Sequence, residues 1–177
     1  MPNIADYLIN RAKQTPYFHL EGYMERFWLV PYASEKAGPG CGKVSWFKNP
    51  LIRFLQTFDI AIRVHHILRS DNAREHHDHP WAYLTVILKG GYTEVTLDYD
   101  KSGLFLGERR RFYGPGSILW RPAKSWHRLE MNIAGEECWT LFTTGKYQQK
   151  WGFLRTPFMK ISYNEYIHKN NCTEDEL

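Results

Sequence analysis

Short strand-like segments, separated by turns that contain glycine or proline, dominate the sequence after residue 60. The first of them alternates between two sets of side chains from Ile60 to Leu68, as an extended strand does. Turn residues such as Gly90-Gly91 and Gly114-Pro115-Gly116 punctuate the series. Such a series predicts an all-β domain, a sandwich or jelly roll. The other strands expected in it are residues 83–88, 92–99, 111–113, 117–121, 126–131 and 138–144.

The two ends of the chain have a different pattern. Ile4, Tyr7 and Leu8 share one face of a predicted helix that ends at Pro16, and a short helix is expected at 163–169. Residues 23–30 indicate a strand, whereas 51–58 fit either a helix or a strand. A chain of 177 residues suits one structural domain. We expect an N-terminal extension (1–58) packed on a β-barrel (59–160), followed by a C-terminal helix and tail (161–177).

Composition excludes several classes of protein. A hydrophobic content of 43% with 16% aromatic residues argues against disorder, and a net charge of +4 is too small to predict nucleic-acid binding by itself. No apolar run approaches the roughly 20 residues of a membrane helix, and the N-terminus lacks a signal-peptide core. We therefore expect a cytoplasmic protein, with Cys41, Cys138 and Cys172 as free thiols.

Histidines give the strongest indication of chemistry. His77 and His79 are two residues apart, so in an extended segment they point the same way. His127 arrives from a later strand. Imidazole is a common ligand of divalent transition metals, and three such ligands leave coordination positions open for chemistry. The alternative for any histidine-rich stretch is a surface loop without function.

The motifs around these histidines resemble those of the cupin superfamily. His77, His79 and Gly90 match its first motif, which reads H-x-H, a glutamate and a closing glycine. Its second motif is matched by Gly116, Pro122 and His127. Two positions depart from the pattern. Tyr83 (or Leu84, with the longer spacing) occupies the glutamate position, and Lys124 replaces a glycine.

The resemblance implies a cupin-type jelly-roll barrel, to which the predicted N- and C-terminal helices are short additions. It also implies one divalent transition metal bound by His77, His79 and His127. Some cupin dioxygenases use three histidines alone, so Fe(II) and oxygenase chemistry on a small molecule are expected, with Zn, Ni or Mn as other possible metals. Two alternatives stay open: a binding module for a sugar or organic acid, and an isomerase or epimerase that uses Tyr83 or a histidine for proton transfer. A homodimer is plausible by analogy with other cupins.

Two further residues are candidates to support the metal. His66 lies on the apolar face of its strand, and the turn at residues 70–74 would bring it near His77 or His79 as a fourth ligand or a hydrogen-bonding partner. Asp78 is a candidate to orient a ligand histidine. The same strand pattern places His65 and Arg63 on the opposite face, away from the expected site.

Other residues are candidates for substrate contact. Tyr83 shares the parity of His77 and His79, so its hydroxyl is expected to reach the cavity as a catalytic group, the alternative being an ordinary core aromatic. The predicted substrate-binding residues are Arg121 and Arg128, through bidentate contacts with a carboxylate, and Trp81 and Trp139, as apolar walls.

Overall fold

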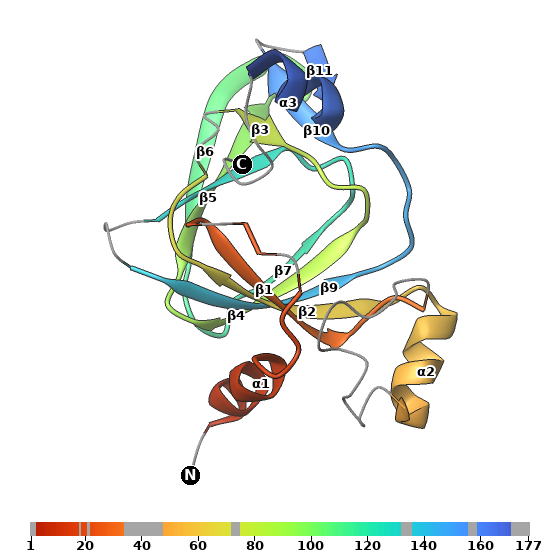
Figure 1. Cartoon of the computed structure of the whole chain (residues 1–177). Helices are drawn as coiled ribbons and strands as arrows, with labels where there is room; N and C mark the ends of the chain where they lie inside the picture. Colours follow the sequence, from red (N-terminus) through yellow and green to blue (C-terminus); the bar gives the residue numbers. More distant parts are fainter. Residues whose placement is uncertain are drawn as a thin grey trace.

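Two antiparallel β-sheets face each other in the computed structural model of the chain (Figure 1). The structure describes residues 3–17, 19–20, 22–33, 48–71, 75–131, 136–155 and 159–170. For residues 167–170 it describes the backbone only. Backbone hydrogen bonds among these residues do not join the two sheets to each other.

The first sheet has five strands in the order β1-β2-β9-β4-β7. Strand β1, from the N-terminal part of the chain, pairs with β2 and forms one edge, so this part extends the sheet itself. The bounds are β1 Met24–Val30, β2 Ala61–Ile67, β9 Cys138–Thr144, β4 Tyr83–Lys89 and β7 Ile118–Arg121.

The second sheet has six strands in the order β11-β10-β3-β8-β5-β6. Its centre carries the two histidine segments, because the short strand β3 pairs with β8. The bounds are β11 Met159–Ser162, β10 Gly152–Arg155, β3 His76–His77, β8 His127–Glu130, β5 Tyr92–Tyr99 and β6 Phe105–Tyr113.

Three helices lie outside the sheets (Figure 1). Helix α1 (Ile4–Ala12) contacts β1 and β2, and Asn3 caps its first turn by accepting a hydrogen bond from the Asp6 amide at 2.9 Å. Helix α2 (Pro50–Thr57) begins at a capping Asn49 followed by proline, which resolves the ambiguity of residues 51–58 in favour of a helix. Helix α3 (Tyr163–Asn170) contacts β10 and β11. None of the helices in the described ranges is long and apolar enough to span a bilayer.

Strand β2 is buried on both faces, and this decides what lies inside the barrel. Val64 on its outer face packs in a cluster with Ile9 and Ala12 of α1. Arg63, His65 and Ile67 line an internal cavity on its other face. Because helix α1 covers the outer face, both faces are shielded from water, and hydrophobicity alone does not identify the inner one.

The closing glycine of the first histidine motif is required by its backbone. Gly90 has a φ of +69°, and a Cβ added there would lie 2.0 Å from the carbonyl oxygen of Glu137. Only glycine combines that conformation with so close an approach. The turn leads the chain into β5. This strand pairs with β8 and supplies a residue of the histidine site.

Most predicted strands are confirmed, with three differences. Strand β6 begins six residues earlier than expected, at Phe105, and the short strands β10 and β11 were not predicted. The strand of the H-x-H segment ends at His77, so His79 lies just beyond it. Amide hydrogen bonds of Asp78 to Gly152 and of His79 to Ala123, both 3.1 Å, still hold the segment extended. Of the three cysteines, Cys138 is a buried free thiol, and Cys41 and Cys172 lie outside the described residues.

Candidate metal centre

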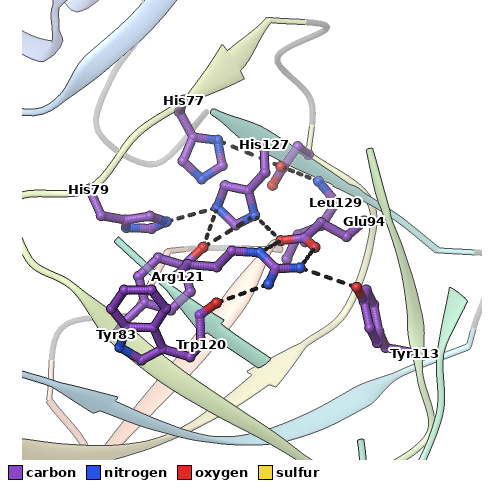
Figure 2. A network of polar contacts seen from close by, with 10 residues as sticks. His77, His79, Tyr83, Glu94, Tyr113, Trp120, Arg121, His127 and Leu129 are labelled. Atoms are coloured by element: carbon purple, nitrogen blue, oxygen red, sulfur yellow. Dashed lines mark hydrogen bonds and ion pairs between the residues drawn. The ribbon is translucent and has the colours of Figure 1, made fainter. Parts of the chain in front are cut away.

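His77, His79 and His127 converge on one point between the sheets (Figure 2). His77 and His127 lie directly opposite each other on β3 and β8, and His79 approaches from the loop after β3. One ring nitrogen from each lies within 4.8 Å of the others, and the Nε2 atoms of His79 and His127 are 2.8 Å apart. Nitrogens that share one ion at ~2.1 Å each lie within about 4.2 Å, so a small ring movement brings all three onto a metal. The group could therefore hold a metal ion.

Burial keeps two of these imidazoles neutral. Burial, reinforced by the neighbouring His127, lowers the pKa of His77 to about 4. Burial and the other two histidines hold the pKa of His79 well below its usual range. A neutral imidazole is the form that binds a metal, so neither residue has to lose a proton at neutral pH.

Glu94 of β5 fixes the orientation of His127. Its carboxylate accepts a hydrogen bond from His127 Nδ1 at 3.0 Å and forms an ion pair with the guanidinium of Arg121 (Figure 2). Because a carboxylate can only accept, Nδ1 carries the proton and Nε2 presents its lone pair to the group. Burial opposes ionisation of Glu94, but these two hydrogen bonds outweigh it and lower its pKa to about 2. Arg121 lies on β7, so the network also links the two sheets.

Glu94 was not identified from the sequence. It belongs to neither histidine motif, although the glutamate of the first motif is replaced here by Tyr83. The sequence did carry a signal, because Glu94 interrupts a segment of otherwise mostly apolar and threonine side chains. In the structure this residue is only 2% exposed. Buried carboxylates require hydrogen-bonding or charged partners, which marks such a position as part of a site.

Tyr83 points into the same group. Its hydroxyl lies 3.2 Å from Nε2 of His127, and the residue is 4% exposed. Burial, followed by the nearby Glu94, raises its pKa well above its usual range, so the phenol stays protonated and acts as a hydrogen-bond donor. The structure therefore places this side chain where the sequence predicted.

Asp71 is a second acidic residue that the sequence did not reveal. Its carboxylate lies 3.8 Å from Nδ1 of His77, too far for a direct hydrogen bond. The same carboxylate accepts a hydrogen bond from the Leu129 amide at 2.7 Å and one from the hydroxyl of Tyr23. These two bonds fix its position beside the histidine group.

An internal cavity of about 400 Å³ opens next to the histidines. Trp81 lines it, as predicted, and many of its other walls are aromatic. A cavity of this volume accommodates a small organic molecule. Besides Trp81, the aromatic residues that line it are Tyr17, Tyr23, Tyr83, Tyr92, Phe142, Trp151, Phe153 and Tyr163.

The prediction that His66 supports the metal is wrong. Its ring nitrogens contact Glu25 and Glu137 at 2.8 and 2.7 Å, and its ring stacks on Trp139 at 3.8 Å. His66 and Trp139 both lie on the outer face of the five-stranded sheet, on the side that helix α1 covers. Trp139 therefore does not line the cavity either. His65 and Arg63, expected outside, line it instead.

Asp78 is buried but does not orient a histidine. Its carboxylate accepts hydrogen bonds from the Gly152 amide and the Gln149 side chain, each at 2.8 Å, and pairs with Lys160. These contacts join the H-x-H segment to β10 and β11. The predicted role near the metal is replaced by a structural one.

Arg121 and Arg128, predicted to bind substrate, lie outside the lining of the cavity. Arg121 is paired with Glu94 and donates to the Tyr113 hydroxyl at 3.1 Å. Arg128 is paired with Glu130 and, at 3.0 Å, with Glu108 on the outer face of the six-stranded sheet. Both cations already have carboxylate partners, and neither lines the cavity.

Comparison with known proteins bears on the fold. No protein-family model matches the chain, and no curated protein matches its sequence. Vicilin from Corylus avellana matches in structure with a TM-score of 0.53 at 10% identity, over 91% of this chain and 40% of that chain. Vicilin from Capsicum annuum matches with a TM-score of 0.51 at 14% identity, over 91% and 39%. A cupin-like protein from Thermotoga maritima matches with a TM-score of 0.46 at 14% identity, over 83% and 84%.

The chain therefore shares the fold of the vicilin chains, and its two facing antiparallel sheets agree with the jelly roll that the sequence predicts. At these identities the likeness concerns the fold alone, and the chain spans about two fifths of the length of the vicilin chains. What this barrel does must therefore be argued from its own side chains.

Proposed function

We propose that the protein binds one divalent transition metal, Fe(II), through His77, His79 and His127 and acts as a dioxygenase on a small molecule. The observation that carries this proposal is the convergence of three imidazoles beside an aromatic cavity. Three neutral ligands leave the charge of the ion uncompensated and leave positions open for substrate and dioxygen. Iron supplies the redox electrons that zinc lacks.

The protein's own groups have distinct parts in this proposal. Glu94 holds His127 in the tautomer that presents Nε2. Tyr83, protonated and 3.2 Å from that nitrogen, donates a hydrogen bond to a molecule that occupies the group. The aromatic walls exclude water, which strengthens polar contacts made inside the cavity.

The metal is tested by elemental analysis of protein purified without a nickel column. We expect one iron per chain, which chelators remove without unfolding the barrel. Stoichiometric zinc or nickel would contradict the oxygenase proposal. Absence of any metal, even after reconstitution, would favour a binding module or an epimerase.

The reaction is tested with an oxygen electrode on iron-reconstituted protein. We expect one class among small thiols, diketones, catechol-like acids and 2-oxo acids to start oxygen uptake, and zinc-loaded protein to remain silent with the same compound. A compound that binds the iron-loaded protein in the cavity, yet leaves dioxygen untouched, would remove the oxygenase proposal and leave the binding module.

Substitutions of Tyr83 test whether this position faces the metal and the bound ligand. We expect Tyr83→Phe to keep metal binding but to lose one hydrogen bond to a bound ligand, which weakens ligand affinity or turnover roughly fivefold. Tyr83→Glu should bind divalent metal more tightly than the wild type, because it adds an anionic ligand. Isothermal titration of the three proteins measures both effects. Equal metal affinity for the wild type and Tyr83→Glu would show that this position does not face the ion.

A further inference from the structure

Arg63 is a buried cation without an anionic partner in the part of the chain that the structure describes. It lies on the inner face of β2, is 5% exposed and lines the cavity. Among the described residues no carboxylate pairs with its guanidinium, and its Nε has no hydrogen-bond partner. Aromatic rings surround it instead. Their centroids lie 4.6 Å (Trp28), 4.9 Å (Trp81), 5.4 Å (Tyr32) and 5.9 Å (Tyr17) from the guanidinium carbon.

Such a cation is costly to keep. Aromatic faces attract a guanidinium, but they accept none of its five N–H groups in the way that a carboxylate does. The loss of hydration on burial therefore remains only partly compensated. Buried arginines are normally paired, so an arginine left unpaired in a cavity wall indicates an anion supplied by a ligand.

Two neighbours give the same wall further polar groups. His65, two residues along β2, stacks on Phe142 at 4.7 Å, and its buried Nε2 has no hydrogen-bond partner among the described residues. Burial, with Arg63 and Arg26 nearby, holds the pKa of His65 well below its usual range, so its ring is neutral. Arg26 lies opposite His65 on β1 and also lines the cavity. The wall thus combines two cations with a neutral imidazole.

In the described part of the chain, no carboxylate pairs with Arg63. Among the described residues that line the cavity, Asp71 is the only carboxylate, and it is held by Tyr23 and the Leu129 amide. The wall also lies close to the metal group: the indole of Trp81 contacts Arg63 on one side and lies 6.3 Å from the ring of His79 on the other. One small molecule can reach both.

We propose that Arg63, with His65 and Arg26, binds the carboxylate of a small organic acid whose other end lies at the three-histidine group. This proposal names the class of substrate for the proposed function. Its second half, the placement of the other end of the molecule at the three histidines, rests on that function. The planar fork of Arg63 matches a carboxylate, and flat aromatic walls enclose a planar group. The anion subsite itself belongs to the five-stranded sheet and does not need the metal.

The test uses the full chain, kept free of metal with a chelator. Acetate, benzoate and 3-phenylpropanoate are each compared with the corresponding neutral amide by isothermal titration. We expect at least one of the acids to bind roughly tenfold or more tightly than its amide, as a charge-assisted contact gives. Arg63→Met should reduce that ratio to about twofold or less. Arg109→Met, which removes an exposed arginine of β6, should leave it unchanged.

If Arg63→Met folds poorly, thermal unfolding of the wild type with each ligand supplies an independent test. In the wild type, the tighter-binding acid should raise Tm and its amide should not, a comparison that needs no variant. Arg63→Lys should keep part of the preference, because the charge remains while the fork is lost. Acids that bind no better than amides in the wild type, or an undiminished preference in a folded Arg63→Met, would overturn the proposal. Because no metal is present, these outcomes are independent of whether iron or dioxygen is involved.

Discussion

Replacing His127 with alanine is expected to abolish metal binding at micromolar metal concentrations. A three-ligand group has no protein ligand to spare, and the expected loss exceeds the roughly 10–100-fold that follows when only a residue orienting a ligand is removed. His77→Ala should have the same effect while leaving the Glu94 network intact. Competition with a fluorescent chelator, combined with elemental analysis, measures the affinity.

His66→Ala is the matched control for this prediction. It removes an imidazole from the outer face of the same barrel, where His66 contacts Glu25 and Glu137. Its metal affinity should equal that of the wild type. Wild-type affinity in folded His127→Ala and His77→Ala would show that the three rings do not share an ion.

Glu94→Gln is expected to lower the free energy of unfolding by about 3 kcal/mol, because it removes the buried charge of the Glu94–Arg121 ion pair and leaves the half-buried Arg121 cation without its counter-charge. Metal affinity should also fall, roughly 10–100-fold, since His127 loses the carboxylate that fixes its tautomer. Urea denaturation of the metal-free proteins separates the first effect from the second. Glu108→Gln is the control: Glu108 also pairs with arginines, Arg110 and Arg128, but on the outer face, so a loss of about 1 kcal/mol or less is expected.

Acid should remove the same stabilisation in the wild type. The pKa of Glu94 is about 2 in the folded protein, against an ordinary value of 4.5. The lower folded value means that the stabilisation is complete above pH 4.5 and is lost as the pH falls from 4.5 through about 2, a change of about 3 kcal/mol. The difference in stability between the wild type and Glu94→Gln should therefore shrink over this interval. A constant difference down to pH 2 would show that Glu94 is not the group responsible.

The sequence predicts the barrel well because its strands are short, regular and separated by strong turn signals. The histidine triad is likewise found, because each of its members lies in a motif of fixed spacing. Strand parity with His77 and His79 was enough to predict that the Tyr83 hydroxyl reaches the cavity, even though β3 ends before His79. These features depend on local sequence, which a single chain displays directly.

The partners of the site could not be predicted in the same way. Glu94 meets His127 only because β5 and β8 are neighbours, a pairing that depends on the whole topology. The sequence assigned His66, instead of His65, to the inner face of β2 for a different reason. Helix α1 buries the outer face of β2, so the apolar residues Ile62 and Val64 mark the helix side of the strand, while the cavity side carries charge. In a barrel that binds a ligand, the more polar face of a covered strand can be the inner one.

The positions of Arg63 and the histidines have a consequence for how such a protein can diverge. His77 and His127 belong to the six-stranded sheet, whereas Arg26, Arg63 and His65 belong to the opposite one. On the proposed function, substitutions along β1 and β2 would alter which molecule is recognised and leave the three histidines unchanged. Libraries restricted to the inward positions of those two strands would therefore explore new specificities. Both strands precede the two histidine motifs in the sequence, so a search guided by the motifs alone would overlook this surface.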